Sequence, residues 1–298
     1  MSIYETKPIH SLSFDVEEYF QVSAFWSESR RQQWDRLESR VEANTRKIAE
    51  LLANQGTKAT FFILGWVAER HPMLVRSLAA EGHEIASHGY GHELITEQTP
   101  QEFREDIRKA KNILENLISQ PVSGYRAPSF SITRATQWAL PILVQEGYTY
   151  DASVFPIVHD RYGIPGANPH CHQLQTEAGP IWEVPPSTYT MMGLRLPVAG
   201  GGYFRLIPYP LLRVFLKRIE RAGHSLVMYL HPWELDPAQP RMAGAQFSKF
   251  RHYNNLDKTE GRLISLIRDF RFGPICETIR PLADRCRLPA ESLLAHGS

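Results

Sequence analysis

The sequence lacks the marks of several protein classes. It contains three cysteines among 298 residues, an odd count without the paired spacing of a metal site, so we expect reduced thiols rather than a disulfide framework. Lysine and arginine number 33 against 32 acidic residues, and this balance of +1 excludes the strongly basic surface that binds DNA or RNA. No uninterrupted apolar run reaches the roughly 18 residues of a transmembrane helix.

The amino-terminal segment also lacks the layout of a secretory signal peptide. Glu5, Lys7 and Pro8 precede any apolar stretch, whereas a signal peptide has a basic start followed directly by an apolar region. The sequence therefore predicts a cytoplasmic location, with no membrane span and no nucleic-acid partner.

What the sequence does contain is a series of short apolar runs that alternate with amphipathic stretches up to about residue 150. Hydrophobic residues make up 43% and charged residues 22%, so the chain can bury a large core. The alternation indicates βαβ units and a mainly parallel sheet. Thr99-Pro-Gln-Glu102 has the residues of a capping box, which predicts a helix from there to about Ile118.

About seven strands with intervening helices predict a single distorted (β/α) barrel, with an open doubly wound sheet as the alternative. We expect one domain over residues 1–298. Residues 155–180 and 235–256 have no sustained period and are predicted to be irregular insertions. A C-terminal extension follows after about residue 257, and within it residues 275–279 are predicted to form a last strand.

Ionisable residues gather where the predicted strands end, which is where parallel α/β folds hold reactive groups. With 12 histidines in the chain, roughly half a pair at any fixed spacing is expected by chance. Taken alone, His88 and His92 are therefore explained equally well as a metal site or as two unrelated surface imidazoles. The joint occurrence favours one site. Five strand ends contribute to it: Asp15 to Glu18, Ser87 to His92, Tyr125 to Pro128, Asp151 to Ser153, and His231 to Trp233.

Taken in order, these segments resemble the motifs of the polysaccharide deacetylases of carbohydrate esterase family 4, the NodB-like deacetylases, over roughly residues 10 to 235. The resemblance implies a NodB-like barrel and a metal-dependent hydrolase that removes N-acetyl groups from sugars. Four segments carry it: Ser13-Phe-Asp15, Ser87-His-Gly-Tyr-Gly-His92, Tyr125-Arg-Ala-Pro128 and Leu230-His231.

The resemblance also implies a role for individual residues. Asp15 corresponds to the catalytic base, Arg126 to the arginine that holds the base, and His231 to the general acid. His88 and His92 correspond to the two metal-binding histidines. The implied cofactor is a divalent metal, Zn²⁺ first, with Co²⁺, Ni²⁺, Mn²⁺ or Fe²⁺ as alternatives.

The chain departs from the family pattern at the position after Asp15, where Val16 stands in place of a metal-binding aspartate. The carboxylate ligand is then Glu17 or Glu18, and the period of two along a strand favours Glu17, on the same side as Asp15. The usual fourth motif is also missing, which leaves Asp151 or Glu183 to orient His231.

Substrate contacts are expected from residues beside these motifs. We predict that the oxyanion of the reaction is held by the metal and by a backbone N–H near Ser129. Trp182 and Tyr189 are further candidates for stacking on sugar rings, although a place in the core explains them equally well. The predicted substrate-binding residues are Tyr125, Pro128, Ser129, Phe130, Asp151 and Trp233.

The predicted partner is an N-acetylated carbohydrate, and near-neutral charge fits a groove for largely uncharged sugars. The segments Asp15 to Val22 and His231 to Glu234 further resemble the branch of the family found with bacterial exopolysaccharide and exosortase gene clusters. A cyclic-amide hydrolase or deformylase of the same family, acting on a small molecule, is the second hypothesis. An inactive carbohydrate-binding relic is the third. The sequence leaves a homo-oligomer open.

Overall fold

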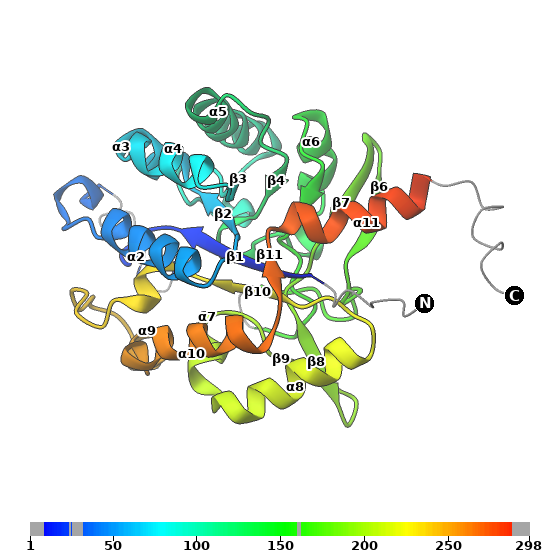
Figure 1. Cartoon of the computed structure of the whole chain (residues 1–298). Coiled ribbons are helices and arrows are strands. Elements are labelled where there is room, and N and C mark those ends of the chain that lie inside the picture. The colour runs from blue at the N-terminus through cyan, green and yellow to red at the C-terminus, as the bar shows by residue number, and fades with distance from the viewer. Residues whose placement is uncertain (1–8, 24, 26–31, 160–161, 288–298) are drawn as a thin grey trace, which may run out of the picture.

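The computed structural model describes residues 9–23, 25, 32–159 and 162–287, with side chains through residue 282, so the expectation about the first eight residues lies outside it. Within these residues one main sheet has nine strands (Figure 1). The strands are β1 (His10–Val16), β2 (Thr60–Ile63), β3 (Glu84–Ser87), β4 (Gly124–Tyr125), β5 (Tyr150–Asp151), β6 (His172–Thr176), β7 (Gly179–Glu183), β10 (Val227–Leu230) and β11 (Phe272–Gly273).

The strands follow the order β10-β1-β2-β3-β4-β5-β7-β6, and β11 pairs with the start of β1. Every pairing is parallel except the one between β6 and β7. The carboxyl ends of seven strands, from β10 to β7, therefore point toward the same edge of the sheet. A separate antiparallel hairpin is formed by β8 (Thr188–Met191) and β9 (Leu194–Pro197).

Helices surround the strands on the outside (Figure 1). No helix of the described residues is long and apolar enough to cross a membrane. The α-helices are α2 (Val41–Asn54), α3 (Gly65–Arg70), α4 (Pro72–Ala80), α5 (Pro100–Ile118), α6 (Ala139–Gln145), α7 (Gly201–Leu206), α8 (Tyr209–Arg221), α9 (Gln246–Tyr253), α10 (Leu256–Asp269) and α11 (Ile275–Arg287). Short 3₁₀ helices are η1 (Trp34–Arg36), η2 (Ile95–Glu97), η3 (Pro128–Phe130), η4 (Arg134–Thr136) and η5 (Pro232–Leu235).

Strand β1 shows how the sequence positions the functional edge. All its residues are buried, but alternate side chains differ in polarity. Leu12, Phe14 and Val16 belong to the large apolar core beneath the helices. Ser13 and Asp15 point to the opposite face, where both accept hydrogen bonds from the Arg126 guanidinium.

The predicted α/β class and distorted barrel are confirmed. The seven adjacent parallel strands from β10 to β7 agree with the number expected from the alternating pattern. The capping box is present at the start of α5, where the Thr99 side chain accepts from the Glu102 N–H and the Glu102 side chain accepts from the Thr99 N–H.

The predicted strand over residues 275–279 is wrong, because this segment begins helix α11. Ile275 and Ile279 are spaced by four, so a helix places both on one face. There they join a buried cluster with Phe62 and Val227 from the main sheet.

The two segments predicted to be irregular contain regular elements. Strand β6 lies within 155–180 and pairs only at the edge of the sheet, so four of its five residues are polar and none is buried. Helix α9 lies within 235–256 and exposes Phe247 and Phe250 while it buries His252. Neither element has the apolar face by which a sequence pattern is recognised.

Replacing Thr99 with alanine tests the capping box. The free energy of unfolding is expected to fall by about 1 kcal/mol, because the Glu102 N–H at the start of α5 loses its acceptor. Urea unfolding followed by circular dichroism measures the change. Thr99→Ser keeps the hydroxyl and should stay close to wild type; equal losses in both variants would show that the cap contributes nothing.

Candidate metal and catalytic site

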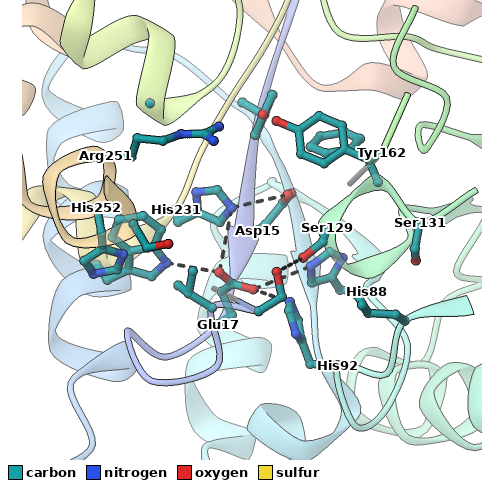
Figure 2. Close-up of a pocket in the computed structure, with 18 of the residues that line it drawn as sticks. Asp15, Glu17, His88, His92, Ser129, Ser131, Tyr162, His231, Arg251 and His252 are labelled. Atoms are coloured by element: carbon teal, nitrogen blue, oxygen red, sulfur yellow. Dashed lines mark hydrogen bonds and ion pairs between the residues drawn. The ribbon is translucent and has the colours of Figure 1, made fainter. Parts of the chain in front are cut away.

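A cavity of about 280 Å³ opens at the carboxyl edge of the sheet (Figure 2). Its deepest part is formed by side chains that follow β1, β3 and β10, and its outer walls come from η3, α7 and α9. The lining residues include Asp15, Glu17, Ser23, His88, His92, Ser129, Phe130, Tyr162, Arg205, Tyr229, His231, Trp233, Ser248, Arg251 and His252.

Glu17, His88 and His92 form a buried cluster in this cavity. One ligand atom from each residue lies within 4.8 Å of the other two. His92 Nε2 is 2.6 Å from Glu17 Oε2, and His88 Nε2 is 3.9 Å from the same oxygen. Two imidazole nitrogens and one carboxylate oxygen are a donor set that suits Zn²⁺ and related divalent ions and leaves coordination positions open.

The ring of His88 is prepared to act as a ligand. Its Nδ1–H donates to the backbone carbonyl of Arg126 at 2.8 Å, which leaves the Nε2 lone pair facing Glu17. Burial lowers the pKa of His88 to about 4, so the ring is neutral at pH 7. Burial alone would raise the pKa of Glu17, but the neighbouring His92 and His231 rings outweigh it and hold the pKa well below its usual range.

Glu18, the alternative carboxylate, lies outside the cavity. It is buried against the start of α2, where its side chain accepts hydrogen bonds from the Ser39 hydroxyl and the Arg40 backbone N–H. The alternation along the chain therefore turns Glu17 toward the two histidines and Glu18 away from them.

Asp15 lies beside this cluster in a buried ion pair. Arg126 Nη1 is 2.6 Å from Asp15 Oδ1, and the same nitrogen donates to Ser13 Oγ at 2.9 Å. The Arg126 Nε–H donates to the Ala152 carbonyl at 3.2 Å. The guanidinium is fully buried, so it holds the Asp15 carboxylate in one orientation.

His231 is oriented by Glu234, not by Asp151 or Glu183 as the sequence predicted. His231 Nδ1 lies 2.8 Å from Glu234 Oε1, and Glu234 Oε2 accepts from Arg205 Nε–H at 2.7 Å. The opposite ring nitrogen, Nε2, is 3.9 Å from Asp15. Burial lowers the pKa of His231, but the Glu17, Glu234 and Asp15 carboxylates outweigh it and raise the pKa to about 9.

Two glycines let Glu234 and Tyr229 approach the chain. A Cβ at Gly201 would lie 1.8 Å from both Glu234 carboxylate oxygens, and one at Gly200 would lie 2.3 Å from the Tyr229 hydroxyl. Gly200 also has a φ of 91°. Gly200 and Gly201 are thus required by close packing around Tyr229 and Glu234, whereas a Cβ at Gly202 would meet nothing within 4 Å.

Ser129 and Phe130 line the cavity in a strained backbone. Their φ angles are 52° and 54°, in the left-handed region that side chains other than glycine rarely adopt. Such strain persists where the surrounding structure enforces it and is common at functional sites. The Ser129 hydroxyl donates to Ser23 Oγ at 2.9 Å across the cavity wall.

Trp233 lines the cavity, but its polar atom contacts the Glu17 carboxylate. The indole N–H donates to Glu17 Oε1 at 3.1 Å. The ring stacks between His231, at 4.9 Å, and His252, at 4.1 Å. Trp233 therefore holds Glu17 and His231 in place as well as forming a wall.

Three predicted substrate-binding residues do not line this cavity. Tyr125, the last residue of the short strand β4, is buried between Phe103 and Tyr148 in the core. Pro128 is buried at the start of η3, and Asp151 is fully buried beside Glu183. Two further stacking candidates also lie elsewhere. Tyr189 stacks on Phe215, and Trp182 packs against the buried cluster that contains Phe62 and Val227.

The structure adds residues that the sequence did not indicate. Glu234 was within the His-Pro-Trp-Glu segment, so its spacing from His231 was the available signal. Arg205, Tyr162, Ser248, Arg251 and His252 come from segments without a motif, and their place at the cavity depends on how α7 and α9 pack.

The chain matches two family models. The polysaccharide deacetylase model covers residues 32–150, and a model described as a domain of unknown function (DUF3473) covers residues 152–280. The main sheet draws strands from both segments, and the cavity lies between them. His88 and His92 fall in the first match, while His231 and Glu234 fall in the second.

Curated relatives match parts of the chain. A peptidoglycan-N-acetylglucosamine deacetylase from Bacillus cereus is 41% identical over 86 residues, which are 29% of this chain and 29% of the relative. A chitooligosaccharide deacetylase from a Bradyrhizobium strain is 29% identical over 85 residues, 28% of this chain and 39% of the relative. The matched segments thus span less than half the length of these relatives.

A solved structure matches almost the whole chain. It is a protein from Mycobacterium smegmatis assigned to the polysaccharide deacetylases, with a TM-score of 0.64, 19% identity, and coverage of 97% of this chain and 95% of that one. At this identity the likeness shows a shared fold.

Replacing Asp151 with asparagine tests the buried carboxyl pair. Burial raises the pKa of Asp151 from 3.8 to about 6, and burial with the Asp151 charge raises that of Glu183 well above its ordinary value. Because these pKa values are higher in the folded protein than in the unfolded chain, the protonated pair contributes its full stability below about pH 4. This stability is lost as the pH rises through about 6.

Relative to wild type, Asp151→Asn should therefore gain on the order of 2 kcal/mol in free energy of unfolding as the pH rises from about 4.5 to about 7.5. Urea titrations across this range measure the difference. Asp257→Asn, at an exposed site on α10, is the control and should follow the wild-type profile. A parallel profile for Asp151→Asn would exclude a shared proton.

Proposed function

We propose that this protein is a metal-dependent N-deacetylase. The family model and the relatives support a polysaccharide deacetylase domain of the carbohydrate esterase family 4, NodB-like type. The proposed enzyme hydrolyses the acetamide of an N-acetylated sugar and releases acetate and the free amine. The substrate is a bacterial exopolysaccharide or its precursor. This finer assignment rests on the resemblance of the segments around Asp15 and His231 to the exopolysaccharide-associated branch.

One observation supports the proposal above the others. A buried Glu17, His88 and His92 cluster, the Asp15–Arg126 pair and the His231–Glu234 pair all meet in one cavity. Burying this many ionisable groups costs stability unless they are paired or bind an ion. Such arrangements are typical of sites where chemistry takes place.

A divalent metal held by Glu17, His88 and His92 would supply a Lewis acid that polarises the acetyl carbonyl and acidifies a water molecule. The Asp15 carboxylate is placed to take a proton from the attacking water as the water oxygen bonds to the acetyl carbon. Arg126 balances the charge of Asp15 and keeps the free oxygen directed into the cavity. Asp15 Oδ2 lies 3.9 Å from His231 Nε2, so base and acid face the same small volume.

His231 completes the reaction by donating a proton to the sugar nitrogen as the carbon–nitrogen bond breaks. Glu234 accepts from Nδ1–H, which directs the Nε2–H toward the cavity. The backbone N–H of Ser129 is a donor for the developing oxyanion, and one such donor typically contributes about 3 kcal/mol to transition-state stabilisation.

A small N-acylated molecule is a second candidate substrate, because Tyr162 and α9 restrict the cavity to about 280 Å³. This volume lies just below the range of roughly 300 to 1,000 Å³ that holds small ligands. Comparing turnover of an N-acetylated monosaccharide with that of its tetramer separates the candidates. The inactive binding relic is less well supported, since its site has no need to retain all three metal-ligand residues and both pairs.

Removing the metal tests the proposal directly. Treatment with a chelator, or the change Asp15→Asn, is expected to abolish acetate release from acetylated oligosaccharides while far-ultraviolet circular dichroism remains that of the folded protein. Readdition of Zn²⁺ should restore the chelated wild type and leave Asp15→Asn inactive. Asp257→Asn is the matched control and should remain active. Full activity after complete metal removal, confirmed by elemental analysis, would contradict metal dependence.

Changing His231 to alanine separates the acid from the metal ligands. Turnover is expected to fall by about 10² to 10⁴-fold, because the leaving amine loses its proton donor. Metal content should stay near that of wild type, whereas His92→Ala should lose the metal. Glu234→Gln should lower turnover less than His231→Ala, with metal retained. Loss of metal in His231→Ala would mean that His231 is a ligand and not the acid.

A further inference from the structure

Most charged side chains of the cavity have a partner. Asp15 pairs with Arg126, Arg205 pairs with Glu234, and Glu17 belongs to the proposed metal-binding cluster. Among the described residues of the lining, two charged side chains lie outside these groups: Glu97, which is exposed on η2, and Arg251.

Arg251 is the positive charge of these two. It lines the same cavity and is half-buried on α9. Among the described residues, its guanidinium has one polar side-chain contact, from Nη2 to the ring nitrogen Nε2 of His159 at 3.1 Å. Throughout the residues that the structure describes, no carboxylate lies within ion-pair distance of Arg251. Figure 2 shows its side chain extending into the cavity above His231 and toward Tyr162.

The position of Arg251 is fixed by the network behind His231. Arg205, which pairs with Glu234, also donates to the backbone carbonyls of Arg251 and His252. The His252 ring stacks on Trp233 at 4.1 Å. The end of α9 is thus tied to the same elements that orient His231, so Arg251 is held beside the reacting groups.

We propose that Arg251 binds an anionic group of the substrate, a carboxylate or a phosphate carried close to the acetamido sugar. The inference rests on the proposed function, because it assumes that the acetamide lies at the metal cluster. A guanidinium presents a planar fork of donors that matches an oxyanion in two hydrogen bonds. The expectation of an uncharged substrate, drawn from net charge alone, is thereby replaced by an acidic acetylated saccharide.

The experiment compares Arg251→Met with Arg241→Met. Both remove one positive charge, but Arg241 is exposed and packs on Tyr253 outside the cavity lining. The probes are triacetylchitotriose, which is neutral, and a hyaluronan tetrasaccharide, which alternates acetamido sugars with uronic acids. Acetate release gives kcat/KM, and calorimetry on the same variants in an Asp15→Asn background gives Kd without turnover.

Wild type and Arg241→Met should bind the hyaluronan tetrasaccharide more tightly than the neutral trisaccharide. Arg251→Met should weaken the acidic probe by about 10 to 100-fold, the effect of losing a hydrogen bond between charged groups, and change the neutral probe less than about twofold. N-acetylglucosamine 1-phosphate compared with N-acetylglucosamine forms the phosphate arm. If Arg251→Met abolishes the preference for N-acetylglucosamine 1-phosphate, the anionic group is a phosphate. If it abolishes only the preference for the tetrasaccharide, the anionic group is a carboxylate.

Equal loss on the neutral and acidic probes would assign Arg251 a structural role and overturn the proposal, as would no change on either. The calorimetric readout separates this outcome from failure of the proposed function. If no probe releases acetate but wild type keeps an anion preference that Arg251→Met lacks, the deacetylase assignment fails and the anion site stands.

Discussion

Charge balance in a buried cavity is the constraint on which the rest of this structure depends. Carboxylates moved out of water are costly unless a cation, a proton or a metal meets each one. Asp15 and Glu234 are met by the guanidinium groups of Arg126 and Arg205, and Glu17 lies with His88 and His92 where a metal would bind. A further buried pair, Asp151 and Glu183, has mainly a proton to share, and its pKa values are raised accordingly.

The charged groups of the cavity come from both halves of the chain. Strand β1 pairs with β2 on one side and with β10 on the other, so Asp15 and His231 end neighbouring strands. Arg205 then reaches from α7 to Glu234 and to the carbonyls at the end of α9. The Glu17 cluster, the His231–Glu234 pair and the cavity wall are therefore one hydrogen-bonded unit, although two family models divide the chain at about residue 151.

The sequence predicted the inner residues of this unit better than the outer ones. Asp15, His88 and His231 follow strands, and parallel strands bring their carboxyl ends together whatever the loops do. Period two along β1 was enough to turn Glu17 into the cavity and Glu18 away from it. Tyr125 shows the limit of the same reasoning, since a strand of two residues can direct its side chain into the core as readily as into the cavity.

By itself the sequence determined the α/β class, the capping box of α5 and the residue types at the functional edge. These depend on local period and on short-range hydrogen bonds, which nearby residues settle. Only the tertiary structure decided that Glu234 orients His231, that Arg205 supports Glu234 and that Arg251 faces the cavity. Each of these contacts depends on how α7, η5 and α9 pack. That packing is set by the shape and charge of segments far apart in the sequence, and a local sequence pattern does not indicate which distant segment an element will contact.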